Sequence, residues 1–321
     1  MDTESGTIIV TGGLGFIGKN FAHQASTQFK EKIILDKFTY ASDLDFYYSV
    51  LRPLGWKLTV GDVKHVSTSL NNVKCSSNVL IVNFAAESHV DRSFKNAKQF
   101  LDANAFGTLS LLDFCRDYGH KLLHISTDEV YGEITGVGVS EDALLNPTNP
   151  YSASKAAADL LVQTYITCFG VDAKIIRANN IFGNRQYFEK VIPKAMYRAS
   201  KSMPFEVHGA KNLRRHFLHT SDFYAAIMKI LISWFDSDER IFNIRADSVI
   251  GIHQLVEHIY NFYEADLDLI STGKDRPFND SEYQVDDKKL RNLGWEPKVD
   301  FWSALDTLCS DNDIFCGNEE T

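Results

Sequence analysis

Short, mostly apolar runs recur along the N-terminal part of the chain, and amphipathic stretches separate most of them. Runs of this kind are typical of strands that are buried on both faces of a parallel sheet. Parallel neighbours need a covering helix in each connection, which the amphipathic stretches supply. The pattern therefore predicts an α/β fold with a doubly wound parallel sheet. The predicted strands are Ile8 to Val10, Ile33 to Leu35, Lys57 to Val60, Val79 to Asn83, Leu122 to Ile125 and Ala173 to Ile176.

A glycine-rich turn, Thr11 to Gly18, follows the first predicted strand and has glycines at positions 12, 15 and 18. Such glycines permit a tight turn and close approach of the backbone to the diphosphate of a dinucleotide. The second run ends in Asp36, where a carboxylate binds the adenosine ribose hydroxyls and repels a 2′-phosphate. NAD is therefore predicted rather than NADP, although the cation of Lys37 weakens that preference. The residues expected around the cofactor are Gly12, Gly15, Phe16, Ile17, Gly18, Asp36, Lys37, Asp62, Val63, Ala85, Ala86, Ser88, Tyr151 and Lys155.

The regular alternation ends near residue 178. Residues 1–178 are predicted to form a Rossmann-type NAD-binding domain, and residues 179–321 mainly a smaller α/β substrate-binding lobe. Within the second part, Arg240 to Ile244 has the apolar character of a strand that returns to the first domain. With 321 residues, 44% of them hydrophobic, the chain is long enough for both parts.

Two further segments carry acid/base residues. Tyr151 and Lys155 are four residues apart, so they share one face of a helix, where an ammonium group lowers the pKa of a phenol. Asp128 and Glu129 are adjacent and follow a buried run, at the sheet edge where open α/β sheets bind ligands. Two carboxyl groups in different environments divide acid and base roles. Either motif alone also fits a solvated helix face or an acidic loop tip, but together they favour catalysis.

Composition favours a cytoplasmic protein. No run approaches about 18 consecutive apolar residues, and the segment Met1 to Ser5 lacks the basic start of a signal peptide. We therefore expect no membrane association. The cysteines follow no Cys-x-x-Cys spacing, and we interpret them as free thiols. They are Cys75, Cys115, Cys168, Cys309 and Cys316.

The net charge of -9 disfavours binding to nucleic acid or acidic lipid. An anionic substrate then requires a local basic pocket. Arg215 lies beside apolar neighbours, and its planar guanidinium suits bidentate binding of a diphosphate. His216 and His219 have no carboxylates at a spacing that completes a metal site, so no metal is predicted.

With these residues in view, the chain resembles the extended short-chain dehydrogenase/reductase superfamily. Within it, the chain is similar to nucleotide-sugar 4,6-dehydratases of the dTDP-glucose 4,6-dehydratase type. The triplet Thr127-Asp128-Glu129 distinguishes a dehydratase from an epimerase, because NDP-sugar 4-epimerases of the superfamily lack an Asp-Glu pair there. The matching segments cover nearly the whole chain. They are Thr11 to Gly18, Asp36 to Ala41, Ala85 to Ser93, Ser126 to Gly132, Tyr151 to Lys155, Glu189 to Pro193 and Asp275 to Pro277.

The resemblance implies conversion of a nucleotide-activated hexose to its 4-keto-6-deoxy derivative. Tyr151, assisted by Lys155 and Thr127, would remove the proton of the C4 hydroxyl while NAD takes the C4 hydride. Glu129 would abstract the C5 proton and Asp128 would protonate the departing C6 hydroxyl. The hydride would then return to C6, so NAD is regenerated in every cycle and can stay bound.

The resemblance also implies a set of substrate contacts. They are Ser88 at the sugar, Asn180 and Arg215 at the diphosphate, Glu189 and Lys190 near the glycosyl phosphate, and Asn243 and Arg276 at the nucleotide. Three departures from the family pattern fall on the substrate side. They are Ile181-Phe182-Gly183-Asn184 for Asn-Tyr-Gly-Pro, Phe188 for Pro, and Arg245-Ala246 for Gly-Gly. These leave open thymine or uracil as the base, and hydroxyl or acetamido at C2.

The first alternative is a UDP-GlcNAc 4,6-dehydratase, with or without inversion at C5. An NDP-sugar 4-epimerase or a non-catalytic NAD-binding regulator is less favoured, because neither needs the tyrosine, lysine and both carboxyl groups together. The resemblance further implies a homodimer built on two helices, Ala105 to Cys115 and Ala156 to Tyr165. Both stretches carry more apolar surface than one buried helix face requires.

Overall fold

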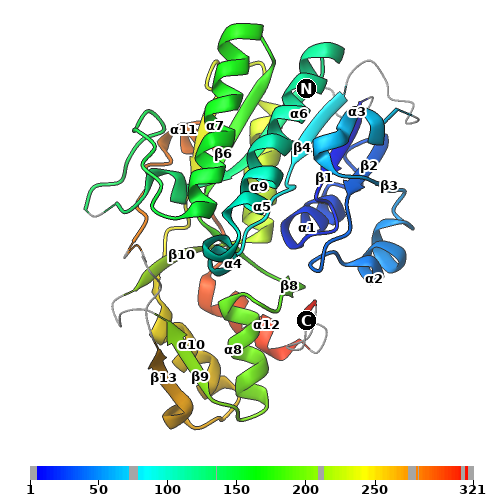
Figure 1. The fold of residues 1–321 in the computed structure, drawn as a ribbon. Coiled ribbons are helices and arrows are strands. Elements are labelled where there is room, and N and C mark those ends of the chain that lie inside the picture. Colours follow the sequence, from blue (N-terminus) through cyan, green and yellow to red (C-terminus); the bar gives the residue numbers. More distant parts are fainter. Residues whose placement is uncertain are drawn as a thin grey trace.

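A seven-stranded parallel sheet forms the larger part of the molecule (Figure 1). The computed structural model describes residues 6–71, 79–134, 136–208, 213–273, 280, 282–311 and 315–316. The strand order is β3-β2-β1-β4-β5-β6-β11, so the sheet is doubly wound about β1. All six strands predicted from the apolar runs are present. The strand bounds are β1 Thr7–Thr11, β2 Glu31–Asp36, β3 Lys57–Val60, β4 Val79–Asn83, β5 Lys121–Thr127, β6 Ala173–Ala178 and β11 Ile241–Ile244.

Helices cover both faces of this sheet, because successive strand residues point to opposite sides. Ile9 and Ile81 face α6 and α7, whereas Ile8 and Val10 face α1. Each buried side chain of this size stabilises the fold by about 1.5–3 kcal/mol. The helices up to residue 178 are α1 Phe16–Gln24, α2 Leu44–Phe46, α3 Val66–Ser69, α4 Val90–Lys95, α5 Ala97–Phe100, α6 Gly107–Tyr118 and α7 Pro150–Phe169. Shorter turns of 3₁₀ or π helix lie at Tyr47–Leu51, Val63–His65, Leu101–Phe106, Asp128–Tyr131 and Leu267–Leu269.

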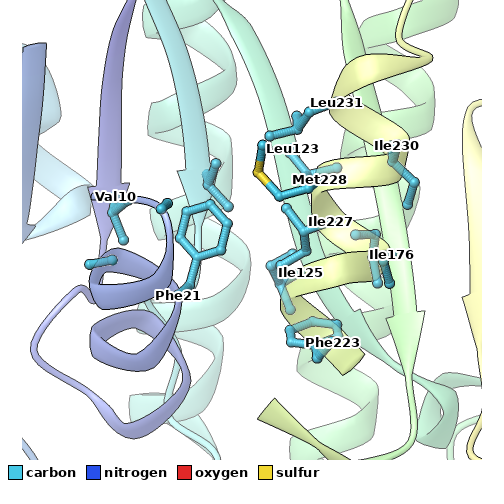
Figure 2. Packing of buried hydrophobic residues seen from close by; sticks show 14 of the residues in the cluster. Val10, Phe21, Leu123, Ile125, Ile176, Phe223, Ile227, Met228, Ile230 and Leu231 are labelled. Carbon is cyan, nitrogen blue, oxygen red and sulfur yellow. The ribbon is translucent and has the colours of Figure 1, made fainter. Parts of the chain in front are cut away.

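Two elements from beyond residue 178 return to the sheet. β11 pairs in parallel with β6, as the apolar segment near residues 240–245 predicts. The helix α9, Thr220–Ile232, was not expected there, yet Phe223 and Ile227 on one of its faces pack over the strands that carry Ile125 and Ile176 (Figure 2). The helix precedes β11 in sequence and covers the sheet as parallel strands require.

The smaller part of the molecule has its own apolar core, built from three helices and short strands (Figure 1). Its helices are α8 Val191–Ser200, α10 Ile252–Phe262 and α12 Phe301–Ser310, and the short helix α11, Lys288–Asn292, contributes Leu290 to the sheet core instead. β10 pairs with β7 in parallel and with β12 antiparallel. The strand bounds are β7 Asn180–Phe182, β8 Gln186–Tyr187, β9 Phe205–His208, β10 Arg214–His219, β12 Val249–Gly251, β13 Ile270–Gly273 and β14 Phe315–Cys316.

Candidate active site

A cavity of about 1090 Å³ lies at the carboxyl ends of the sheet strands, where the two parts of the molecule meet. Its walls come from the glycine turn after β1, the ends of β2, β4 and β5, the first turns of α7, and the segment 186–190 together with parts of α8, β9 and β10. This volume is at the upper end of what ligand pockets usually have, so the cavity can hold a large ligand. Each site residue predicted from the sequence can therefore be described by whether it lines this cavity.

The glycine turn fits a diphosphate. Gly12 has φ of +64°, and a Cβ there would lie 2.7 Å from the Cα of Ala85. At Gly18 a Cβ would collide with the carbonyl oxygen of Gly12. α1 begins at Phe16 without a capping side chain on Gly15, so the amides of its first turn have no side-chain acceptor at the N-cap and are available to an anion. Gly12, Gly15, Phe16, Ile17 and Gly18 all line the cavity.

Asp36 ends β2 and lines the cavity beside the turn. Its carboxylate accepts hydrogen bonds from Leu14 N at 3.0 Å, Phe38 N at 2.9 Å and the Ser42 hydroxyl at 3.0 Å. Because a carboxylate offers about four lone-pair sites, these bonds fix its orientation and leave capacity for a ribose hydroxyl. The Nζ of Lys37 lies 3.9 Å from Asp62 Oδ2, which draws the cation away from Asp36.

The other predicted cofactor residues divide into two groups. Lys37, Val63, Ala85, Ala86 and Ser88 line the cavity. Asp62 is not among the lining residues, because its carboxylate caps the turn that follows β3 through Lys64 N at 2.9 Å. Asp62 contacts Lys37, which does line the cavity.

The residues at the start of α7 determine where the helix begins and so where Tyr151 and Lys155 lie. Asn149 and Ser152 form a capping box, and Pro150 occupies the first turn. Tyr151 then faces the cavity, and Lys155 follows one turn later on the same side. The Nζ of Lys155 is buried and donates to Ile125 O at 2.6 Å, so a strand carbonyl holds the ammonium group.

The expectation that Lys155 lowers the pKa of Tyr151 is wrong for the protein chain by itself. Burial raises the pKa of Tyr151 and the charge of Glu129 raises it further, while an interaction with the Thr127 hydroxyl lowers it. Burial also lowers the pKa of Lys155 to about 8, against the opposing charge of Asp159. Lys155 interacts with the strand rather than with the phenol, and the nearest charges to the phenol are negative.

Asp128 and Glu129 lie in different environments, as the sequence predicts for two carboxyl groups with separate roles. Asp128 is buried behind the cavity wall, and its carboxyl group accepts from Asn179 Nδ2 at 2.6 Å and from the Thr127 hydroxyl at 3.1 Å. Burial and the neighbouring charge of Glu129 raise its pKa to about 7. Glu129 itself lines the cavity and accepts from Asn149 Nδ2 at 3.3 Å. Burial raises its pKa as well, although the charge of Arg215 opposes this.

Most predicted substrate contacts also reach the cavity. The lining residues among them are Ser88, Asn180, Glu189, Lys190 and Arg215. Lys190 donates to Ser88 O at 3.2 Å, and Arg215 donates to Asp280 O at 2.9 Å. The guanidinium of Arg215 also lies 4.9 Å from the ring centre of Tyr283, so it is held in place from two sides.

Asn243 lies elsewhere. Its side chain is fully buried in β11, donates to Val139 O and Asp286 O, and accepts from the Tyr131 hydroxyl at 2.8 Å. Asn243 does not line the cavity, because its side chain points into this buried network of polar groups instead. Arg276, the remaining prediction, lies outside the described residues.

Four polar residues at the site were missed by the sequence reasoning. Asn149 contacts Glu129, Asn179 contacts Asp128, and Asp280 and Tyr283 contact Arg215. Of the four, Asn149 and Asn179 lie next to elements that the sequence predicts. The position of Asn149 before Pro150 is a helix-start signal that predicts its place. Asp280 and Tyr283 are more than sixty residues from Arg215 in sequence, and no local pattern indicates them.

Among the described residues, no three His, Cys, Asp or Glu side chains cluster as a metal site would require. His216 is bonded to Ala246 O at 2.9 Å and His219 to the Ser221 hydroxyl at 2.8 Å. No helix in the described part of the chain combines the length and apolar character needed to cross a membrane. Cys115, Cys168 and Cys309 are free thiols.

A doubly wound sheet with this glycine turn, and a tyrosine and lysine one turn apart beside it, defines an extended short-chain dehydrogenase/reductase. The adjacent carboxyl groups narrow the class to nucleotide-sugar 4,6-dehydratases. The chain belongs to the family described as GDP-mannose 4,6 dehydratase, which matches residues 9–308. This confirms the resemblance predicted from the sequence.

Three known proteins illustrate the similarity. The chain is 37% identical over 315 residues to the low-salt glycan biosynthesis protein Agl12 of Haloferax volcanii, covering 98% of this chain and 99% of that protein. It is 33% identical over 307 residues to a trifunctional UDP-glucose 4,6-dehydratase of Arabidopsis thaliana, covering 93% of this chain and 46% of the plant protein. The structure of the dTDP-glucose 4,6-dehydratase DesIV from Streptomyces venezuelae, with NAD and TYD bound, matches with 32% identity and a TM-score of 0.85, covering 94% of this chain and 95% of DesIV.

Proposed function

We propose that the protein is an NDP-hexose 4,6-dehydratase that converts dTDP-glucose or a UDP-sugar to its 4-keto-6-deoxy derivative with bound NAD. The observation that carries the proposal is the connection between the acid/base residues. The Thr127 hydroxyl interacts with both Tyr151 and Asp128, and Glu129 lines the same cavity. A substrate ring in this cavity can therefore meet Tyr151 as the base for the C4 hydroxyl and Glu129 as the base for C5, and Asp128, the acid for the C6 hydroxyl, lies directly behind the wall in contact with Thr127.

NAD fits the residues at the sheet end of the cavity. The glycine turn leaves room that a side chain would fill, and the uncapped first turn of α1 offers amides to a diphosphate. Asp36 supports NAD over NADP because its fixed carboxylate would repel a 2′-phosphate. When bound, NAD would accept the C4 hydride and return it at C6.

The protein residues would move the protons. Tyr151 takes the proton of the C4 hydroxyl in its phenolate form. Because the chain by itself raises the pKa of this phenol, the positive charges of Lys155 and of bound NAD would favour the phenolate. The C4 ketone makes the C5 proton acidic, and Glu129 removes it as a general base. Asp128 supplies a proton to the departing C6 hydroxyl, because its raised pKa keeps a substantial fraction of the carboxyl group neutral near pH 7.

Lys155 has a supporting role in this scheme. Its ammonium group is fixed on Ile125 O and lies one helical turn from Tyr151. A lysine with a pKa near 8 stays mostly protonated at neutral pH, so it supplies positive charge on the sheet side of the phenol when the C4 oxygen becomes anionic.

The opposite end of the cavity suits the anionic part of the substrate. Arg215 and Lys190 bring positive charge to it, and Asn180 offers an amide. Arg215 is oriented by Asp280 and Tyr283, which favours bidentate contact with a diphosphate. This local basic pocket reconciles an anionic substrate with a net charge of -9.

A homodimer is the proposed assembly. Leu101 and Phe106 are exposed, on the turn before α6, as are Leu160 and Phe169 on α7. Their exposed fractions are 41%, 55%, 55% and 53%. Apolar side chains of this size at neighbouring positions are expected at an isologous helix interface.

The substrate distinguishes this function from its alternative, a UDP-GlcNAc 4,6-dehydratase. Purified protein is incubated in parallel with dTDP-glucose, UDP-glucose and UDP-GlcNAc, and products are identified by mass and proton NMR. Loss of water from dTDP-glucose or UDP-glucose supports the proposal. Turnover of UDP-GlcNAc alone supports the alternative, and a product of unchanged mass with an inverted C4 would point to an epimerase.

A further inference from the structure

Asp43 is a buried carboxylate that joins three segments of the chain. Its Oδ2 lies 2.7 Å from Lys19 Nζ and 2.7 Å from Arg185 Nε, and its Oδ1 lies 3.1 Å from Arg185 Nη2. Asp43 and Lys19 are only 4% and 1% exposed. Burial raises the pKa of Asp43, but the hydrogen bonds and charges of the two cations outweigh it and hold the pKa well below its usual range. The carboxylate is therefore ionised wherever the protein is folded.

Two of these segments belong to the cofactor end of the cavity. Lys19 directly follows Gly18, the last glycine of the diphosphate turn. Asp43 ends the loop that begins at Asp36, and its backbone N–H donates to Leu14 O at 3.0 Å within that turn. The Lys19–Asp43 pair consequently fastens the ribose loop to the diphosphate turn.

The third segment comes from the smaller part of the molecule. Arg185 immediately precedes residues 186–190, here called the strap, all of which line the cavity. Arg185 has φ of +60°, a conformation that non-glycine residues adopt at a cost and that requires outside support. A second bond beside it, from Asn20 Nδ2 to Asn184 O at 3.1 Å, links α1 to the same segment.

Contacts between residues that line the cavity continue this link. The rings of Tyr40 in the ribose loop and Tyr187 in the strap are 5.1 Å apart, and the Tyr40 hydroxyl donates to Glu189 at 3.2 Å. The strap therefore lies beside the ribose loop, and the Arg185–Asp43 pair is its most buried attachment.

We propose that Arg185 is a positioning residue which, by its bidentate pairing with Asp43, holds the strap beside the ribose loop and slows the release of the bound dinucleotide. The inference rests on the proposed NAD-dependent function and deepens it. NAD that is regenerated in each cycle need not leave, and an attachment beside the cavity makes retention a property of the fold.

Replacing Arg185 does not leave the buried Asp43 carboxylate without a cation. In Arg185→Ala the carboxylate keeps Lys19 and its bond from Phe46 N at 3.0 Å, so the buried charge stays compensated and the variant is expected to fold. Arg185→Lys preserves the charge but not the bidentate geometry, and should recover only part of the effect. Arg52→Ala is the matched control, because Arg52 is exposed and stacks only on Tyr48 among its described aromatic contacts.

The experiment measures NAD retention directly. Each purified protein is dialysed, its bound NAD is counted per chain, and the release rate is followed by exchange with labelled NAD. We expect Arg185→Ala to release NAD about tenfold faster or more, as for the loss of one charge-assisted bidentate contact. With saturating NAD, kcat should stay within about twofold of wild type, so the defect appears in the NAD requirement.

The possible results distinguish failure of the proposed function from failure of the positioning role of Arg185. If wild-type protein retains no NAD, the proposed function itself fails. Retention by the wild type with equal release rates in Arg185→Ala and Arg52→Ala would overturn the positioning role alone. So would a fall of kcat at saturating NAD that matches the change in release. If Arg185→Ala does not fold, Arg185→Lys decides, since wild-type release from this variant would equally reject the bidentate attachment.

Discussion

The proton that Asp128 donates should give dehydration an alkaline limb near pH 7. Burial and the charge of Glu129 raise the pKa of Asp128 to about 7. The carboxyl group is therefore protonated below that pH and loses its proton as the pH rises through it. The rate of C6 hydroxyl departure should fall on the alkaline side, whereas a carboxyl group with its ordinary pKa would leave no acid at neutral pH.

Asn179→Ala perturbs this limb in a defined direction. Asn179 Nδ2 donates to Asp128 Oδ2 at 2.6 Å and favours the ionised form. A hydrogen bond to a charged group contributes about 1.5–3 kcal/mol, and one pKa unit corresponds to about 1.36 kcal/mol. Removing the bond should move the limb upward by about 1 to 2 pH units. The variant also loses the bond from Ala246 N at 3.2 Å, at a cost of about 1–3 kcal/mol in the free energy of unfolding.

The assay is the pH dependence of kcat for dehydration, measured with saturating substrate. Asn261→Ala serves as the matched control, because Asn261 is exposed on α10 far from the carboxyl pair in the fold. The control should keep the wild-type limb. An unchanged limb in Asn179→Ala, or one displaced to lower pH, would refute Asp128 as the group that titrates and donates.

Four further substitutions, in three experiments, test other parts of the account. Tyr151→Phe should abolish C4 oxidation and all later steps, whereas Glu129→Gln should still form reduced cofactor while slowing deuterium exchange at C5 by about 10² to 10⁴; equal loss of both signals in the two variants would contradict their separate roles. Leu160→Glu should give a monomer by light scattering at micromolar concentration, because it places a charge in the proposed interface; a wild-type monomer would reject that interface. Phe223→Ala should lower the free energy of unfolding by about 3–5 kcal/mol in a denaturant titration, and a change below about 1 kcal/mol would contradict its place in the sheet core.

The inner strands of the large sheet were predictable because they are buried on both faces, so burial largely determines their composition, whereas the edge strand β3 is partly exposed. The start of α1 was harder to predict, because the helix begins at Phe16 inside the glycine-rich turn, with Gly15 as its N-cap and no capping side chain. The short strands of the smaller part, such as β7 and β12, are too brief to produce a pattern. Their pairing depends on partners distant in sequence.

In the candidate site, too, local sequence patterns were predictable and contacts between distant residues were not. Residues at strand ends and in the first turn of α7 were predictable, because a parallel sheet brings its carboxyl ends together. The raised pKa of Tyr151 was not predictable, since it depends first on burial of the phenol and then on the charge of Glu129. Asn243 likewise fits the motif but faces a buried network whose members, Tyr131, Val139 and Asp286, are 43 to 112 residues away in sequence.

The path of the C4 hydrogen tests the central claim most directly. dTDP-glucose carrying deuterium at C4, and the UDP-sugar labelled in the same way, are converted by purified protein without added NAD. Proton NMR and mass spectrometry then locate the label. The account predicts a 4-keto-6-deoxy product that carries the deuterium at C6, because oxidation at C4 and reduction at C6 share one bound cofactor. Deuterium lost to solvent, or retained at C4 in a product of unchanged mass, would contradict it.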